Sequence, residues 1–380
     1  MINMKEEKDN STKDKIISAA IDLFAELPYE KVSIAQICKN AGVSNGIIYT
    51  YFKNKIELFQ YLLEEVIRRI EHYFENIEGN DIKERLESYI NINLELTKKE
   101  FKIIRIYRAG QYKFIEYEKK IKIIYINGLE KVFNRRMEIY ESFFLLSGIR
   151  FINIFYTANN LECDVKFLVK ILLYGFLGEF KISIKNFNEM SFFLRVPFNS
   201  SSVKCLLLEK GTEIFMKKDF FDIKILDITK AASISSGNFY NYFSSKDEFF
   251  KEIIVRFKKQ LFYFLKDNYK KEFLPNENHV MFLYLMLEYF KDSYYKDKIM
   301  REAEFIAPEL YFKYLNKDFN FYLETLDELN YSFERKKIIV AILLGIAYYM
   351  RIEFFYTKNI ANKEEFLEKI SYFLKNGVSL

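Results

Sequence analysis

Apolar residues recur at helical spacing along most of this 380-residue chain. Within residues 59–77 and again within 250–265 they fall three or four positions apart, which predicts two long amphipathic helices. These positions are Phe59, Leu62, Leu63, Val66, Ile70, Tyr73, Phe74 and Ile77, then Phe250, Ile253, Ile254, Phe257, Leu261, Phe264 and Leu265. No strand-like alternation bounded by turn residues stands out, so the pattern predicts an all-α fold.

The chain repeats itself at an offset of 191 residues. SNGIIYTYFKNKIELF, from Ser44, and SSGNFYNYFSSKDEFF, from Ser235, share eight of sixteen positions. The match continues without a gap from about 12–74 onto 203–265, and later segments match at offsets of up to about 200. A period this long indicates two whole domains and not a solenoid. The Ser/Asn cluster and Pro197 within 183–202 predict the join between them.

The repeated segment has the local signals of two short helices joined by a tight turn. Ser33 and Gln36 form a predicted capping box at the start of a first short helix. Gly42 then allows the chain to turn, and Ser44 is predicted to cap a second helix that runs through Tyr51. This geometry is typical of a helix-turn-helix, whose second helix enters the DNA major groove.

The second copy departs from the first at both helix ends. Lys224 replaces the capping Ser33, and Ser233 replaces the turn residue Gly42. Each change is predicted to cost about 1 kcal/mol. Because the aromatic and lysine positions remain, the sequence favours a second motif that binds DNA, with a structural relic as the alternative.

The candidate DNA contacts lie in and beside the two predicted recognition helices. They are Ser33, Ser44, Asn45, Gly46, Ile47, Tyr49, Thr50, Tyr51 and Lys55 in the first copy, and Ser235, Ser236, Gly237, Asn238, Tyr240, Asn241, Tyr242 and Lys246 in the second. Lys55 and Lys246 fall in the first turn of the following helix, where a cation and free N–H groups suit a phosphate. Phe52 and Phe243 are predicted to be core anchors.

These residues carry a resemblance to a known family. The long N-terminal helix, the glycine turn, Ser-x-Gly-x-x-Tyr-x-Tyr-Phe and the following lysine resemble the DNA-binding domain of the TetR family of transcriptional regulators. The resemblance implies all-helical units, each with a three-helix DNA-binding domain and a helical ligand-binding and dimerisation domain. It also implies a DNA operator and a small-molecule effector as partners, with repression as the usual activity.

Carried onto this chain, the resemblance implies two such units in tandem. DNA-binding domains are expected at 1–55 and 191–246, and helical regulatory domains at 56–190 and 247–380, with ligand among about 81–135 and 278–330. The last two helices of each half, about 141–158 with 165–180 and 336–356 with 362–376, are expected to form a mutual four-helix interface. The chain would then be a monomeric pseudo-dimer, with a homodimer of tandem chains as the alternative.

Composition and charge add little to this interpretation. The net charge is +5, and residues 1–55 hold eight lysines and seven acidic residues, so charge alone does not indicate nucleic acid. The wealth of Phe and Tyr matches an AT-rich genome and is weak support for a binding role. Three scattered cysteines and a charged N-terminus predict a cytoplasmic protein without a signal peptide. The apolar run Ile338–Met350 is too short to span a bilayer and predicts a buried helix.

Enzymes are the class that the sequence disfavours. There is no glycine-rich phosphate loop, metal motif or nucleophile with a histidine partner, so we predict no catalytic residues, metal or cofactor. The two histidines, His72 and His279, lie alone on predicted helices and are expected to be solvated or packed. A TetR-fold scaffold with weak or one-sided DNA binding remains the alternative to a regulator.

Overall fold

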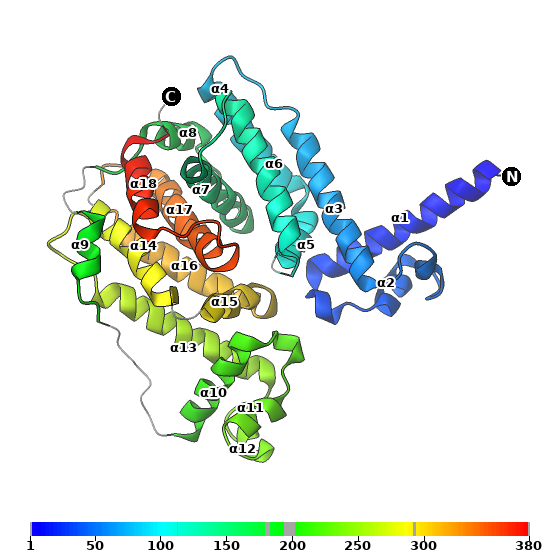
Figure 1. Cartoon of the computed structure of the whole chain (residues 1–380). Coiled ribbons are helices and arrows are strands. Elements are labelled where there is room, and N and C mark those ends of the chain that lie inside the picture. The colour runs from blue at the N-terminus through cyan, green and yellow to red at the C-terminus, as the bar shows by residue number, and fades with distance from the viewer. Residues whose placement is uncertain are drawn as a thin grey trace. The chain divides into compact units, whose positions relative to one another are not determined.

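The computed structural model describes residues 2–111, 113–178, 183–193, 202–291, 294–327 and 329–378. Every regular element in these ranges is helical, which confirms the predicted all-α fold (Figure 1). The chain divides into two compact units, Met1–Glu138 with Asn153–Val165, and Ile139–Ile152 with Lys166–Leu380. We call these unit 1 and unit 2. Part of the predicted join, residues 194–201, lies outside the described residues.

Unit 1 begins with a small helical domain and continues into longer packed helices. Its elements are α1 (Ile2–Glu26), η1 (Tyr29–Lys31), α2 (Ile34–Ala41), η2 (Ile47–Thr50), α3 (Lys55–Phe74), α4 (Ile82–Lys99), α5 (Phe101–Gln111) and α6 (Ile115–Phe133). α7 (Ile139–Ala158) is shared between the two units, with its last residues in unit 1. The long α3 buries most of the predicted apolar stripe, whereas Tyr73 is half-buried and Ile77 lies beyond the end of the helix. This helix connects the small domain to the rest of unit 1.

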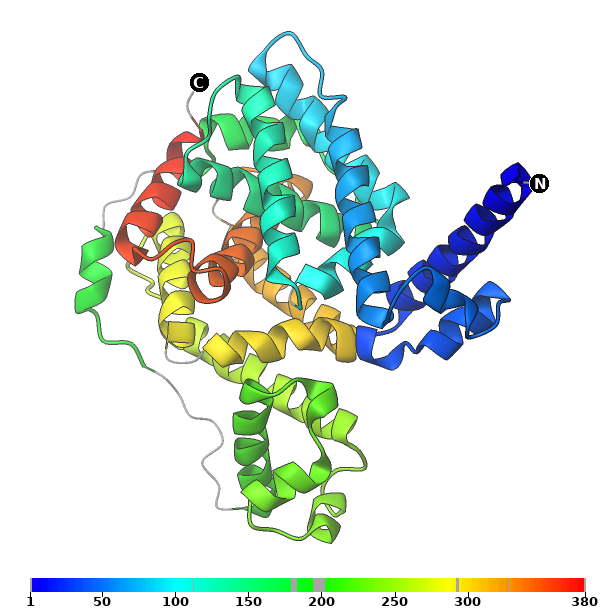
Figure 2. The same ribbon diagram turned by 45° about the vertical axis from the view of Figure 1, so that its right-hand side comes forward.

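Unit 2 repeats this order and adds helices from the first half of the chain. Its elements after α7 are α8 (Val165–Tyr174), α9 (Ile184–Glu189), α10 (Val203–Lys217), η3 (Phe220–Asp222), α11 (Ile225–Ala231), α12 (Ser236–Tyr240), α13 (Lys246–Asp267), α14 (Pro275–Lys291), α15 (Tyr294–Ile306), α16 (Pro308–Glu324), α17 (Phe333–Arg351), the π-helix η4 (Ile352–Tyr356) and α18 (Lys363–Asn376). Figure 2 shows α10, α11 and α12 gathered against the start of α13. The boundaries of the four domains expected from the sequence stay a prediction, since the two units follow contacts and not the sequence repeat.

The two small domains have matching cores, except that one small and one large side chain differ at a pair of facing positions. Ala20 and Leu58 are buried in the first, and Gly211 and Phe249 are buried at the equivalent positions of the second. A Cβ on Gly211 would lie 2.3 Å from Cζ of Phe249. The larger ring therefore fits because the facing residue, Gly211, has no Cβ. Phe52 and Phe243 are buried as predicted.

Within unit 2, α7 and α8 pack against α17 and α18, which Figures 1 and 2 both show. The ring centroids of Phe143 and Phe366 are 5.1 Å apart, and those of Phe144 and Phe373 are 5.5 Å apart. A Cβ on Gly345 would lie 2.4 Å from the carbonyl oxygen of Ser147, so the backbones of α7 and α17 approach closely. The predicted four-helix interface between the two halves thus forms within one chain.

A reciprocal pair of backbone hydrogen bonds closes this interface at the ends of α8 and α18. The N–H of Phe176 donates to the carbonyl of Leu374 at 2.9 Å, and the N–H of Val378 donates to that of Leu172, also at 2.9 Å. The two donors, Phe176 and Val378, are 202 residues apart, and so are the two acceptors, Leu172 and Leu374. This arrangement is isologous, the pattern expected where two copies meet across a two-fold axis.

Glycines make this close approach feasible. Gly175 and Gly377 have φ of +75° and +70°, a region that other residues rarely adopt. A Cβ on Gly175 would lie 2.0 Å from the carbonyl oxygen of Lys375, and one on Gly377 would lie 2.2 Å from the carbonyl carbon of Leu173. We call the two glycines and the paired hydrogen bonds the glycine clasp.

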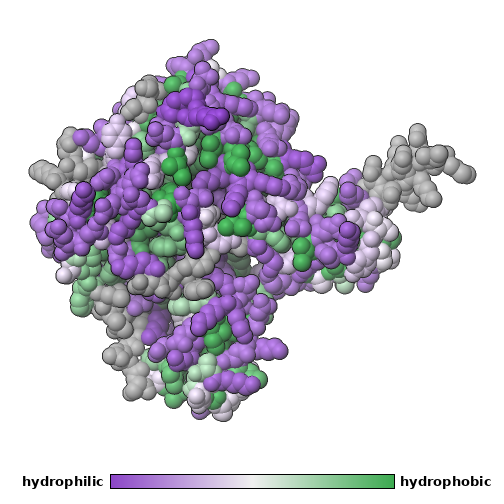
Figure 3. All heavy atoms as spheres, viewed as in Figure 1, coloured by the Kyte–Doolittle hydropathy of each residue, from purple (hydrophilic) through white to green (hydrophobic). Residues whose placement is uncertain are grey.

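The apolar helix α17 lies in the core of unit 2. The segment Phe333–Tyr356 has the length and hydropathy of a membrane span, but 78% of its apolar window is buried inside the protein. The buried helix predicted at Ile338–Met350 is confirmed. Figure 3 shows hydrophilic residues over most of the visible face, with smaller apolar patches between them.

Candidate functional site

The first helix-turn-helix begins with the predicted capping box. The N–H of Gln36 donates to Oγ of Ser33 at 3.2 Å, and the N–H of Ser33 donates to Oε1 of Gln36 at 2.8 Å. α2 ends at Gly42, whose φ of 67° and ψ of 32° are left-handed. The predicted turn is therefore confirmed, and the hydroxyl of Ser33 is already engaged in capping α2.

The first recognition element differs from the prediction in extent. A helix was expected from Ser44 through Tyr51, but the structure has a 3-10 turn, Ile47–Thr50, without a side-chain cap. Two consecutive β-branched isoleucines after Gly46 disfavour a regular α-helix here. Ile48 is buried, while the predicted contacts on either side of it are exposed, with Tyr49 at 58%.

The second recognition element is an α-helix. Oγ of Ser235 accepts the N–H of Asn238 at 3.4 Å and caps α12. Phe239 is buried and Tyr240 is 58% exposed, the same fraction as Tyr49. The side-chain amide of Asn241 donates to Oδ1 of Asn238 at 3.2 Å. Ser236, Gly237, Asn238, Asn241 and Tyr242 are exposed, so the predicted contacts of the second copy also lie at the surface.

The two weakened helix ends of the second copy are visible in the structure. A lysine side chain has no acceptor, and Lys224 makes no side-chain cap. Asp227 compensates in part, because its carboxylate accepts the N–H of Lys224 at 2.9 Å. That hydrogen bond lowers the pKa of Asp227. Ser233 takes the place of Gly42 with a φ of 55°, in the left-handed region.

The two predicted phosphate lysines bind backbone carbonyls within their own domains. Nζ of Lys55 donates to the carbonyls of Tyr29 and Val32, both at 2.9 Å. It also lies 4.1 Å from the centroid of the Tyr29 ring, and burial lowers its pKa. Lys246 repeats this arrangement, with 2.7 Å to the carbonyls of both Phe220 and Ile223. Each ammonium has three donors, so two are used to hold the turn after the first helix.

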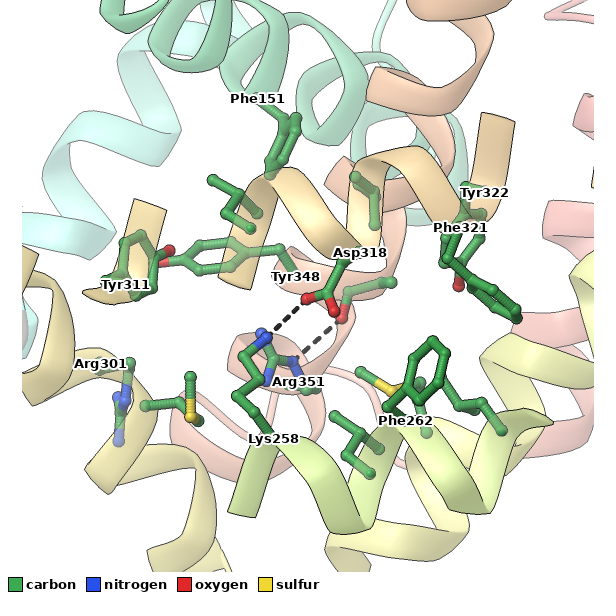
Figure 4. Close-up of a pocket in the computed structure, with 17 residues that line it drawn as sticks. Phe151, Lys258, Phe262, Arg301, Tyr311, Asp318, Phe321, Tyr322, Tyr348 and Arg351 are labelled. Atoms are coloured by element: carbon green, nitrogen blue, oxygen red, sulfur yellow. Dashed lines mark hydrogen bonds and ion pairs between the residues drawn. The ribbon is translucent and has the colours of Figure 1, made fainter. Parts of the chain in front are cut away.

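The middle helices of unit 2 enclose an apolar cavity. Residues of α13, α14, α15, α16 and α17 line it, together with Phe151 of α7 (Figure 4). The lining is Phe151, Lys258, Leu261, Phe262, Leu265, Met286, Met300, Arg301, Tyr311, Leu315, Asp318, Phe321, Tyr322, Leu344, Ala347, Tyr348 and Arg351. The enclosed space is about 70 Å³, so the side chains nearly fill it. About half of this lining falls within 278–330, where the resemblance implied a ligand site, and no individual lining residue was predicted.

Ion pairs bring charge to the edge of this apolar cavity. Nζ of Lys258 lies 2.6 Å from Oδ2 of Asp318, and Figure 4 shows the two side chains pointing toward one another. Arg351 lies 3.1 Å from Oδ1 of the buried Asp297, which also contacts Arg301 at 3.2 Å. Four charged side chains line the cavity, and three of them are cationic.

Helix α15 connects this cavity to the second DNA-binding domain. Met300 and Arg301 line the cavity, while two neighbours on the same helix contact the start of η3. Nζ of Lys298 lies 2.7 Å from Oδ1 of Asp219, and Oε1 of Glu302 accepts the N–H of Phe220 at 3.3 Å. A shift of α15 caused by a change in the cavity would therefore act directly on the turn that Lys246 also holds.

The histidines are placed as expected. The side chain of His72 is 78% exposed beside Glu75. His279 is buried in α14 and stacks on Tyr322 with ring centroids 5.8 Å apart. Burial lowers its pKa to about 4. In the described part of the chain, no three His, Cys, Asp or Glu side chains come together as a metal site.

Comparison with known sequences matches both DNA-binding domains to one family. The family described as bacterial regulatory proteins, tetR family, matches residues 16–62 and again 207–253, at the offset of 191 found in the sequence. The fatty acid metabolism regulator protein of Bacillus subtilis is 36% identical over 88 residues, which are 22% of this chain and 41% of that protein. The repressor DhaR of Mycobacterium sp. GP1 is 39% identical over 51 residues, 13% of this chain and 26% of that protein. The chain thus spans less than half of either relative.

Longer matches are weaker in identity. The uncharacterized regulator YvdT of Bacillus subtilis is 29% identical over 135 residues, 34% of this chain and 68% of that protein. Among solved structures, a TetR-like regulator from Rhodococcus sp. RHA1 is similar with a TM-score of 0.37 and 17% identity, over 42% of this chain and 92% of that one. From the two family matches, together with two helix-turn-helix domains of the same construction, we conclude that this chain carries the DNA-binding domain of the TetR family twice.

Proposed function

We propose that the chain is a sequence-specific DNA-binding transcriptional regulator that acts in the cytoplasm as a single-chain pseudo-dimer. The observation that carries this proposal is the internal four-helix interface of unit 2, closed by the glycine clasp. A TetR-family protein uses such an interface to pair two DNA-binding domains. Here one chain supplies both domains and both sides of the interface.

The proposed readers of DNA are the exposed residues around η2 and α12. They differ at three aligned positions, where Asn45, Ile47 and Thr50 correspond to Ser236, Asn238 and Asn241. Ile47 offers a thymine methyl only an apolar contact. An asparagine can pair with the adenine edge through two hydrogen bonds, worth about 1–3 kcal/mol against a wrong base. Asn238 would have to release the amide of Asn241 to do so.

Two unlike readers on one chain select an asymmetric site. We expect two different half-sites about one helical turn apart, with the more discriminating contact under the second copy. Selection of bound sequences from a random DNA pool tests this expectation. The triple substitution Ser236→Asn, Asn238→Ile and Asn241→Thr should shift the selected site towards a palindrome. A wild-type preference for a perfect palindrome would contradict the proposal of two distinct readers.

The lysines Lys55 and Lys246 are proposed to contact a DNA phosphate. Replacing either by Ala should weaken binding to specific and random DNA about equally and lower the salt slope by about one. Because each lysine also holds a turn, urea unfolding of the same variants must be measured alongside. A loss of DNA binding for Lys55→Ala alone, at equal stability of both variants, would identify the second motif as a relic.

We propose that a small-molecule effector binds in the cavity of unit 2. Two features support this role: its apolar lining with a few charged groups, and the contacts of α15 with both the cavity and η3. Relatives named as regulators of fatty acid metabolism and as repressors are consistent with such a switch. The chain is proposed to have no catalytic role.

A scaffold with weak DNA binding is the competing proposal, favoured by the two lysines that are engaged with carbonyls. A mobility shift on genomic fragments at increasing salt separates the two functions. A regulator should retain selected fragments at salt concentrations that release random DNA, whereas a scaffold should release both together. Light scattering then tests the pseudo-dimer, for which a mass near 45.8 kDa is expected.

A further inference from the structure

The Lys258–Asp318 ion pair stands between the apolar cavity and a second, outer groove. This groove has a volume of about 380 Å³, within the range of roughly 300–1,000 Å³ found for ligand sites. It is formed by residues of α13 and α16, and Lys258, Phe262, Asp318 and Phe321 line it as well as the inner cavity. These four residues are therefore the partition between the two spaces, and we call them the gate.

We infer that the gate admits an amphipathic organic anion, with its head group in the outer groove at Lys258 and its apolar body in the inner cavity. The inference rests on the proposed effector role of the cavity and adds to it the chemical class of the effector. It also assigns the access route, from the outer groove between Phe262 and Phe321.

The exposure of the ion pair determines the sign of the head group. The side chain of Lys258 is 11% exposed and that of Asp318 is 29% exposed. An incoming carboxylate can therefore take the place of Asp318 at Nζ of Lys258, while the displaced carboxylate remains close to water. A cationic head group would instead pair with Asp318 and leave a buried lysine without its partner, which is costly.

The charges of the outer groove also favour an anionic head group. Lys259 and Lys317 line it in addition to Lys258, whereas its acidic residues are Asp318 and Glu324. Three lysines against two carboxylates give the groove an excess of positive charge. Such a groove attracts anions and raises their local concentration.

The inner cavity supplies the surface for an apolar body. Most of its lining is aliphatic or aromatic. The rings of Phe262 and Phe321, which Figure 4 shows close together, have centroids 5.4 Å apart, so entry of a ligand between them must separate the rings. The cavity is nearly filled, so the body must displace side chains. Met286 and Met300 can move most readily, because methionine is unbranched and flexible. Met300 lies on α15, so its displacement reaches the helix that contacts η3.

Three probes with the same tail and different head groups test the class of ligand. Decanoate, decanol and decyltrimethylammonium are titrated by calorimetry into the full-length protein, below the concentrations at which they form micelles. We expect decanoate to bind at least about tenfold more tightly than either of the others, because one hydrogen bond between its carboxylate and Lys258 should contribute a difference of at least that size. Equal or tighter binding of the neutral or cationic probe, or no binding of decanoate, would overturn the inference.

Two gate variants and one control locate the head group. Lys258→Gln should reduce decanoate affinity about tenfold or more and leave decanol unchanged. Asp318→Asn should increase decanoate affinity at least about threefold, because it removes the competing carboxylate. Lys259→Gln is the control, since it removes the same charge from the next residue, which does not line the inner cavity. An equal effect of Lys258→Gln and Lys259→Gln would show that only the general charge of the groove matters.

Mobility shifts on the same preparations test the DNA-binding proposal independently of the ligand proposal. If decanoate binds as expected but no DNA fragment is retained, the proposed regulator fails and the site stands. If DNA is retained specifically and decanoate does not bind, the gate fails and the regulator stands.

Discussion

The glycine clasp provides a direct test of the internal interface. We consider the substitution Gly377→Ala, which adds one methyl group at the end of α18. The new Cβ would lie 2.2 Å from the carbonyl carbon of Leu173 and 2.3 Å from its oxygen and from the nitrogen of Tyr174. These neighbours are all backbone atoms, so they cannot move aside by changing a rotamer. The ends of α8 and α18 must separate.

The cost has two parts. Gly377 has a φ of 70° and a ψ of −173°, which an L-residue can adopt only at about 1–3 kcal/mol. Separation also breaks the hydrogen bond from Val378 to Leu172, worth about 0.5–1.5 kcal/mol. We therefore expect a loss of about 2–4 kcal/mol, a large fraction of the roughly 5–15 kcal/mol by which proteins are stable.

Urea unfolding at equilibrium measures this loss, and Gly178→Ala serves as the control. A Cβ on Gly178 meets nothing within 4 Å, so its substitution should cost little. Gly175→Ala should cost about as much as Gly377→Ala, and the double variant less than their sum, because the first substitution already separates the helix ends. If Gly377→Ala costs no more than Gly178→Ala, the clasp does not hold the interface as we describe.

Further substitutions test individual features of both units. Ser233→Gly should stabilise by about 0.5–1 kcal/mol by relieving a left-handed φ, and Gly42→Ser should destabilise unit 1 by a similar amount; thermal melts measure both. Gly211→Ala should cost about 1–3 kcal/mol by overpacking, and adding Phe249→Leu should restore much of it, as measured in urea. Burial lowers the pKa of His279 from 6.5 in the unfolded chain to about 4 in the folded protein. The free energy of unfolding should therefore decrease as the pH is lowered from 6.5 towards 4, and at pH 5 the loss relative to neutral pH should be about 2 kcal/mol. His279→Phe should lack this loss, and an equal fall in both proteins would contradict the burial of a neutral imidazole.

Features that depend on neighbouring residues were predictable from the sequence. The capping box at Ser33 uses hydrogen bonds to a residue three positions away. The apolar stripe of α3 also depends only on spacing along one helix. Local patterns of this kind predicted the all-α class, the turn at Gly42 and the repeat, which together carried the resemblance to the family, but not the 3-10 form of η2.

Features that depend on distant residues were not predictable. Lys55 reaches carbonyls 23 and 26 residues before it, and no local pattern distinguishes this role from a phosphate contact. The glycine clasp joins atoms about 200 residues apart, so Gly175 and Gly377 have no individual signal in the sequence. The inner cavity gathers side chains from six helices, and apolar residues that line it have the same spacing as those of the core.

A covalent pseudo-dimer removes a constraint that a homodimer cannot escape. In a homodimer, every substitution appears on both sides of the interface, so each contact must be self-complementary. In this chain the two sides already differ, because Gly345 faces the backbone of Ser147 while Gly148 faces the side chain of Ile342. The linked halves also pair at an effective concentration set by the chain and not by its expression. One half can therefore change its recognition element without the same change in the other half, and η2 and α12 differ in this way.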